Sequence, residues 1–131
     1  HRMKFGYFAN VTNRHDQPFG VLMNEQIALA QYLDTHDWDS VWYTEHHFSY
    51  EGFEVVPNPV LMSTWTAAHT KRLRIGQAAN IITFWHPLRF AEDIAMLDHM
   101  SGGRIEVGVG RGICGREALQ LNKMADPRNP A

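Results

Sequence analysis

The sequence contains only one cysteine, Cys114, among its 131 residues. A single cysteine excludes an intramolecular disulfide, which fits a protein of a reducing compartment. No apolar run approaches the roughly 20 residues that a membrane-spanning helix requires. His1 and Arg2 resemble residues left by cloning, and Met3 is a plausible natural start with no signal peptide behind it. We therefore expect a cytoplasmic protein without a membrane partner.

The sequence also lacks an excess of charge of either sign. Twelve Lys and Arg residues stand against 14 Asp and Glu residues, the formal net charge is -2, and no run of like charges occurs. Proteins that hold nucleic acid usually carry basic patches or tracts. A nucleic acid partner is therefore not expected.

The length limits the domain organisation. With 44% hydrophobic residues, a chain of 131 residues can bury one core but not the cores of two ordinary domains. We expect a single domain over residues 1–131, in which residues 125–131 form a frayed tail.

The hydrophobic pattern predicts strands and helices in alternation. Short apolar or alternating runs predict four strands, at residues 4–9, 40–44, 73–82 and 105–110. Capping residues and helical periodicity predict four helices, at residues 24–37, 58–72, 86–101 and 117–124. Apolar stripes predict the inner faces of two helices: Leu61, Trp65 and Ala68; and Phe90, Ile94 and Leu97. In the fourth strand, the apolar residues Ile105, Val107 and Val109 alternate with other residues.

The order β-α-β-α-β-α-β, with a possible last helix, requires parallel strands and right-handed crossovers. Two α/β architectures fit this order, a small doubly wound sheet and half of a (β/α)8 barrel. The stretch Gly108-Val109-Gly110-Arg111-Gly112 matches the dinucleotide fingerprint G-x-G-x-x-G only in part, and it follows the fourth strand rather than the first. A dinucleotide-binding Rossmann fold is therefore weakly supported.

Polar and aromatic side chains follow the second predicted strand, in the run Glu45-His46-His47-Phe48. The carboxyl ends of parallel strands carry the active sites of α/β folds, so this run predicts the edge of a site. Neighbours on extended backbone point in opposite directions, so His47 is expected to pack away from His46. In the third strand, Gly76, Ala78 and Ala79 are small, which predicts that something large lies close to the backbone.

Short motifs along the whole chain closely resemble those of the bacterial luciferase-like flavin monooxygenases, which are (β/α)8 barrels. They are Lys4-Phe5-Gly6, Ser40-Val41-Trp42, Glu45 to Phe48, Asn58-Pro59, Thr70 to Gly76, Ala78-Ala79, His86 to Arg89, Ala91 to Asp93, Leu97-Asp98, Ser101 to Arg104 and Gly108 to Gly112. Because a complete barrel needs about 250 residues, the resemblance implies the N-terminal half of a barrel, a partial domain whose residues 3–124 form the first four β/α units.

The resemblance implies a role for individual residues. His46 matches a catalytic acid or base near the reactive edge of the flavin, and Glu45 matches a residue lining the flavin site. Ala78-Ala79 matches a non-proline cis peptide bond that faces the isoalloxazine ring. Arg111 matches an arginine that contacts the FMN phosphate, with the backbone of Ile113 close by.

Elementary chemistry supports these roles. Histidine can exchange a proton near neutral pH. A guanidinium binds a phosphate through two parallel hydrogen bonds, and flanking glycines let the backbone approach it. Gly110, beside Arg111, would also leave room for a flat ring, and it stands where light-emitting members of the family have a cysteine.

The implied activity is that of an FMN-dependent monooxygenase. Reduced FMN, supplied by a flavin reductase, activates O2, and oxygen passes to an aldehyde or a similar small organic substrate. No metal is expected in this reading. Two alternatives stay open: a non-catalytic flavin-binding or assembly half-barrel, and a metal-dependent barrel hydrolase with Glu45, His47 and His86 as ligands.

Half of a barrel leaves two strand edges without a neighbour, so we predict a homo-oligomer, for example two copies paired by a two-fold axis. Light scattering or sedimentation of the chain should then give about twice the monomer mass of 15.0 kDa. A clean monomer would contradict this prediction.

Overall fold

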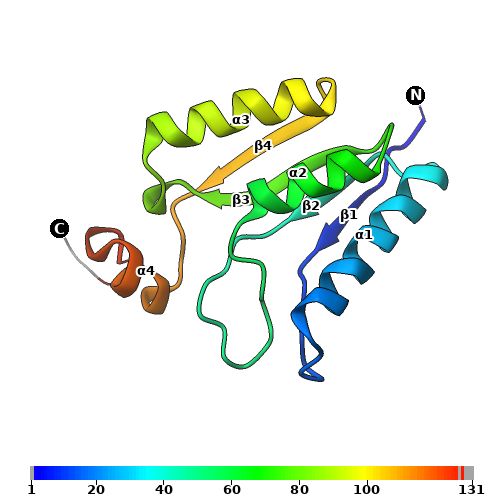
Figure 1. Ribbon diagram of the computed structural model, residues 1–131. Helices are drawn as coiled ribbons and strands as arrows, with labels where there is room; N and C mark the ends of the chain where they lie inside the picture. Colours follow the sequence, from blue (N-terminus) through cyan, green and yellow to red (C-terminus); the bar gives the residue numbers. More distant parts are fainter. Residues whose placement is uncertain (1, 127, 129–131) are drawn as a thin grey trace.

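In the computed structural model, residues 2–126 and 128 are described, and they form an open sheet covered by helices (Figure 1). The strands are β1 (Gly6–Ala9), β2 (Ser40–Tyr43), β3 (Arg74–Ile81) and β4 (Ile105–Gly110). The helices are α1 (Phe19–Thr35), α2 (Pro59–His69), α3 (Pro87–Ser101) and α4 (Gly115–Leu121), with 3-10 turns η1 (Ile82–Phe84) and η2 (Lys123–Ala125). Among the described residues, no helix is long and apolar enough to cross a membrane.

The strand order decides between the two expected architectures. The strands stand in the order β1-β2-β3-β4, and each neighbouring pair is parallel. A doubly wound sheet reverses its strand order at a switch point and carries helices on both faces. Here the order does not reverse, and α1, α2 and α3 lie on the same side of the strands (Figure 1). The structure therefore shows consecutive β/α units of a (β/α)8 barrel, as predicted.

The starts of two helices are confirmed. The side chain of Asn58 accepts a hydrogen bond from the backbone N–H of Leu61 at 2.8 Å, and Pro59 is the first residue of α2. Pro87 likewise opens α3, which ends at Gly102 in the left-handed conformation, with a φ of 69°. The capping residues recognised in the sequence therefore predict where both helices begin.

The predicted start of α1 at Asn24 is wrong, because the helix already begins at Phe19. The carbonyl of Pro18 accepts the N–H groups of Val21 and Leu22 at 2.9 and 3.2 Å. A proline has its φ fixed near the helical value, so it can lead directly into a helix without a polar cap.

The predicted buried stripe of α2 is also wrong. Leu61 is 66% exposed, and the residues of α2 that face the sheet are Val60, Met62, Ser63, Thr66 and Ala67. Small and hydroxyl side chains let the helix approach the strands closely, and their polar atoms find partners there. Ser63 Oγ accepts a hydrogen bond from the side chain of Gln77 on β3 at 2.9 Å. Leu61 lies on the outer side and lines an apolar groove, and Trp65, which is half-buried and packs against the edge of the core, lines the same groove.

Near the end of the chain, the apolar residues of β4 differ in burial. Ile105 is buried, while Val107 and Val109 are 46% and 55% exposed. Among the described strands, β4 has a neighbour on one side only. Residues 125–131 were expected to form a frayed tail, and of these Ala125 and Asp126 are buried. Residues 127 and 129–131 of that tail lie outside the described residues.

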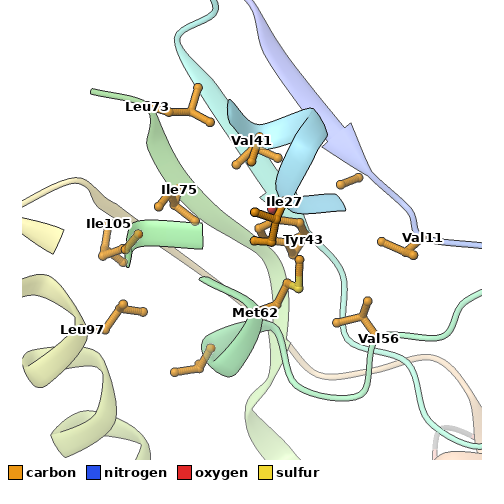
Figure 2. Close-up of a cluster of buried hydrophobic side chains, with 14 of the residues drawn as sticks. Val11, Ile27, Val41, Tyr43, Val56, Met62, Leu73, Ile75, Leu97 and Ile105 are labelled. Carbon is orange, nitrogen blue, oxygen red and sulfur yellow. The ribbon is translucent and has the colours of Figure 1, made fainter. Parts of the chain in front are cut away.

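The core lies between the sheet and the helices. Figure 2 shows Tyr43 of β2 beside Ile27 of α1 and Met62 of α2. Tyr43 is 1% exposed, and its hydroxyl lies 2.8 Å from the hydroxyl of Thr66. Burial raises the pKa of Tyr43 to about 12, because the phenolate would have to form away from water, and the hydrogen bond with Thr66 offsets only part of this.

Asp34, near the end of α1, ties the connection between α2 and β3 to the first helix. Its carboxylate accepts the backbone N–H groups of Lys71, Arg72 and Leu73 at 2.9, 2.8 and 2.7 Å. Partial burial raises the pKa of Asp34, but the three N–H donors and the charge of Arg72 outweigh it, so the net pKa is lowered.

Asp34→Ala should lower the free energy of unfolding by about 1–3 kcal/mol at neutral pH, because three backbone donors lose their acceptor. The pKa of Asp34 is lower in the folded than in the unfolded chain, where it is about 3.9. The charge-dependent stability is therefore present above about 3.9 and is lost as the pH falls through the lower folded value. Urea unfolding at neutral and acid pH measures this effect.

The matched control is Glu25→Ala, which removes an exposed acid from the same helix. An equal loss of stability in both variants, or a loss in Asp34→Ala that grows toward acid pH, would contradict the role of Asp34.

Candidate functional site

A cavity of about 550 Å3 lies at the carboxyl ends of the strands. Residues of β1, β3 and β4 form its wall together with the loops that follow the strands and with Glu117 of α4. All the site residues predicted from the sequence line it: Glu45, His46, Ala78, Ala79, Gly110, Arg111 and Ile113. The fold thus brings together residues from three strand ends, while the chemical role of each stays a prediction.

Glu45 is the buried anchor of this edge of the sheet. The residue is 2% exposed, and its two carboxylate oxygens meet three groups. One oxygen lies 2.8 Å from Nε2 of His47, and the other accepts the backbone N–H of Ile81 at 2.6 Å. The indole N–H of Trp85 donates to the carboxylate at 3.0 Å. The carboxylate therefore holds the ends of β2 and β3 and the entry to α3 in one arrangement, and its direct contact with a cofactor remains a prediction.

His46 projects between two further carboxylates. Its backbone N–H donates to the carbonyl of Val56 at 2.9 Å. Its Nδ1 lies 3.4 Å from a carboxylate oxygen of Glu54 and 3.5 Å from one of Glu117. The side chain is 23% exposed, so the imidazole is partly open to the cavity.

His47 faces away from the cavity, as the alternation of extended backbone predicts. Its ring contacts Glu45 and lies edge-on to Phe84, with ring centroids 5.8 Å apart. The next residue, Phe48, has a φ of 58°, a left-handed conformation that a bulky side chain rarely adopts. The backbone turns sharply there, directly after the two histidines.

The expected cis peptide bond between Ala78 and Ala79 is present. The pairing of β3 with β4 shifts between Gln77 and Asn80, so the two alanines leave the regular ladder and face the cavity. A Cβ on Gly108 would lie 2.1 Å from the carbonyl oxygen of Gln77, so only glycine allows this close approach of β4.

The large group expected near the small residues of β3 is found in part within the chain itself. A Cβ on Gly76 would lie 2.2 Å from the indole of Trp42, so at this position glycine makes room for a tryptophan of the neighbouring strand. Ala78 and Ala79, by contrast, line the open cavity. Small residues on β3 therefore serve two purposes: Gly76 makes room for Trp42, and Ala78 and Ala79 leave the cavity open.

Arg111 lies at the cavity edge on the loop after β4. Its backbone carbonyl accepts a hydrogen bond from the hydroxyl of Thr83 at 2.9 Å, which fixes the loop. Within the described part of the chain, its guanidinium has no hydrogen-bond or ion-pair partner. Gly112 follows with a φ of 89°, a backbone conformation that suits glycine. The loop thus presents an exposed cation at the cavity edge, where its charge can meet an anion.

The ligand set suggested for a metal-dependent hydrolase is not assembled. Glu45 and His47 are in contact, yet the described residues contain no group of three or more His, Cys, Asp or Glu side chains that could hold a metal ion. The hydrolase alternative therefore has no structural support.

Two acidic residues of the cavity were missed at the sequence level, Glu54 and Glu117. Glu54 belongs to the long loop after β2, and Glu117 lies in the first turn of α4 after the glycine-rich loop. Both follow the carboxyl end of a strand, and that position was the available signal. Without coordinates, neither could be paired with His46.

The comparisons with known proteins agree with the fold. A sequence model of the family described as luciferase-like monooxygenase matches residues 3–127. The chain is 35% identical over 111 residues to the oxygenase component of the flavin-dependent trigonelline monooxygenase of Acinetobacter baylyi, a match that covers 84% of this chain and 30% of that protein.

Solved structures show the same fold. Monooxygenase RslO1 from Streptomyces bottropensis superposes with a TM-score of 0.84 at 33% identity, over 91% of this chain and 36% of that one. The oxygenating constituent of 3,6-diketocamphane monooxygenase from Pseudomonas putida, solved in complex with FMN, superposes with a TM-score of 0.86 at 24% identity, over 92% and 33% of the two chains. The second likeness concerns the fold alone. The chain spans about a third of the length of these relatives.

Glu45→Gln should lower the free energy of unfolding by about 1–3 kcal/mol. The amide keeps only one acceptor oxygen, and its N–H₂ group would face a donor that now bonds to the second carboxylate oxygen. Urea unfolding followed by far-UV circular dichroism measures the loss. The control is Glu106→Gln, which breaks a half-exposed ion pair with Arg74 on the same sheet and should cost less than about 1 kcal/mol. Equal losses in the two variants would show that Glu45 is not a special anchor.

Proposed function

The chain belongs to the family of luciferase-like monooxygenases, and we propose that it forms the cofactor-binding wall of an FMN-dependent member. One observation carries the proposal. A single cavity wall combines the flat, small surface of Ala78 and Ala79 with the available cation of Arg111 and the imidazole of His46.

The residues present fit FMN in shape and charge. The isoalloxazine ring is flat and needs a surface without large side chains, which Ala78, Ala79 and Gly110 provide. The phosphate needs a cation and a backbone that can approach it closely. Arg111 can bind a phosphate through two parallel hydrogen bonds, and the turn at Gly112 brings the backbone near.

Reduced FMN, when bound, supplies the electrons that activate O2. The residues of this chain orient the ring, hold the phosphate and move a proton. His46 is the proton carrier in this proposal, since it lines the cavity and histidine exchanges protons near neutral pH. Glu45 keeps the end of β2, and with it the position of His46, fixed from below.

Further parts of the proposal concern the whole protein. We expect a flavin reductase to supply reduced FMN, an aldehyde or a similar small organic molecule to receive the oxygen, and a cytoplasmic location. Because the chain spans about a third of its relatives, the opposite wall of the cavity would come from sequence beyond these residues, so we expect little turnover from this chain alone. If turnover is absent altogether, the proposal reduces to a half-barrel that binds flavin without catalysis.

A homo-oligomer remains part of the proposal. Large apolar side chains are exposed on the inner side of the sheet, on β4 and on α2, as seen for Phe8 at 58%, Val109 at 55% and Leu61 at 66%. Exposed apolar surface of this kind favours association.

The chain should bind FMN and quench its fluorescence, and Arg111→Ala should weaken binding by roughly 10- to 100-fold, as expected for a lost charge-assisted phosphate contact. The matched control is Arg89→Ala, which removes the same charge from an exposed pair with Glu92 on α3 and should leave binding unchanged. Absence of quenching by the unaltered chain, or equal weakening by both variants, would contradict the proposed cofactor site.

A further inference from the structure

We propose that Glu117 and Glu54 are positioning residues for His46, which together hold its imidazole with the proton on Nδ1 and leave Nε2 as the nitrogen available for proton exchange. The inference rests on the proposed function, because the choice of nitrogen matters for a residue that exchanges a proton in the cavity. Its evidence, however, is the geometry around the ring.

Glu117 is placed to act on both histidines of the β2 end. The residue is 3% exposed, although it carries a carboxylate. One carboxylate oxygen accepts the backbone N–H of His47 at 2.6 Å, and the same oxygen lies 3.5 Å from Nδ1 of His46. A buried carboxylate requires partners of this kind. Glu117 therefore fixes the backbone beside His46 and places negative charge next to its ring.

Glu54 approaches the same ring nitrogen from the loop after β2. Its carboxylate lies 3.4 Å from Nδ1 of His46, and the side chain is 39% exposed. The loop is fastened directly after Glu54, since Val55 donates its N–H to the carbonyl of Val11 and the carbonyl of Val56 accepts the N–H of His46. Nδ1 thus faces one buried and one solvent-reaching carboxylate.

The two carboxylates beside Nδ1 influence which tautomer the imidazole of His46 adopts. In a neutral imidazole one nitrogen carries the proton and the other carries a lone pair. Two carboxylates lie within ion-pair distance of Nδ1, and an ionised carboxylate can accept a hydrogen but cannot donate one, so their negative charge favours the form with hydrogen on that atom. Nε2 is then left with the lone pair, and a general base needs this lone pair in the cavity. The bond between Glu45 and Nε2 of His47 cannot serve this purpose, because it acts on the other ring.

The test is nitrogen-15 NMR of the histidine rings in the whole 131-residue chain, at a pH where the imidazoles are neutral. The chemical shifts of Nδ1 and Nε2 report which atom carries the proton, and the signals of His46 are identified by their loss in His46→Gln. The unaltered chain should show mainly the Nδ1–H form. Glu117→Gln should lower its ratio to the Nε2–H form by roughly three- to tenfold, because the neutral amide removes a negative charge that lies 3.5 Å from Nδ1.

Glu54→Gln gives a second test on a more exposed residue, so the proposal stays testable if Glu117→Gln does not fold. It should shift the tautomer in the same direction, and the double variant should shift it furthest. Glu51→Gln is the matched control. Glu51 lies in the same loop and also reaches α4, through Arg116 at 3.2 Å, but it belongs to another pair. This variant should leave the tautomer of His46 unchanged.

The Nε2–H form in the unaltered chain, or no shift in Glu54→Gln and the double variant, would overturn the inference. A shift in Glu51→Gln as large as in Glu54→Gln would overturn it as well, because it would indicate a general loosening of the loop. The measurement requires no flavin. A failed FMN titration with the expected tautomer would therefore reject the cofactor proposal alone, while FMN binding with the wrong tautomer would reject this inference alone.

Discussion

The buried carboxylate of Glu45 is the interaction on which the site depends. A charged group with 2% exposure needs strong partners, and it finds them in the N–H of Ile81, the indole of Trp85 and the ring of His47. These groups come from separate segments of the chain. One carboxylate therefore sets the relative positions of the β2 end, the β3 end and the entry to α3, and the cavity lies directly beside this junction.

The side chains of the two histidines that follow β2 point in opposite directions. His47 is turned into the structure and completes the partners of Glu45, while His46 is turned to the cavity between Glu54 and Glu117. Alternation along extended backbone produces this division without any special device. On β3, Gly76 faces the indole of Trp42. After it, the pairing with β4 is interrupted, and Ala78 and Ala79 face the cavity.

Much of the fold could be read from the sequence, since short apolar runs and the Asn58-Pro59 and His86-Pro87 signals locate strands and helices. The faces of α2 could not, because its buried side combines Val60 and Met62 with small and hydroxyl residues, and the partners of the polar ones, such as Gln77, lie far away in sequence. For the site, the motif residues were found by resemblance and meet at one cavity. Glu54 and Glu117 were missed, because their meaning depends on which strand ends become neighbours and on where α4 docks.

The contact between Glu117 and His47 joins residues that are 70 positions apart in the chain. Closing a loop of this length costs more chain entropy than closing a local turn. The surroundings of His46 therefore depend on two distant elements at once, because the carboxylate next to its ring comes from α4 while the ring itself follows β2.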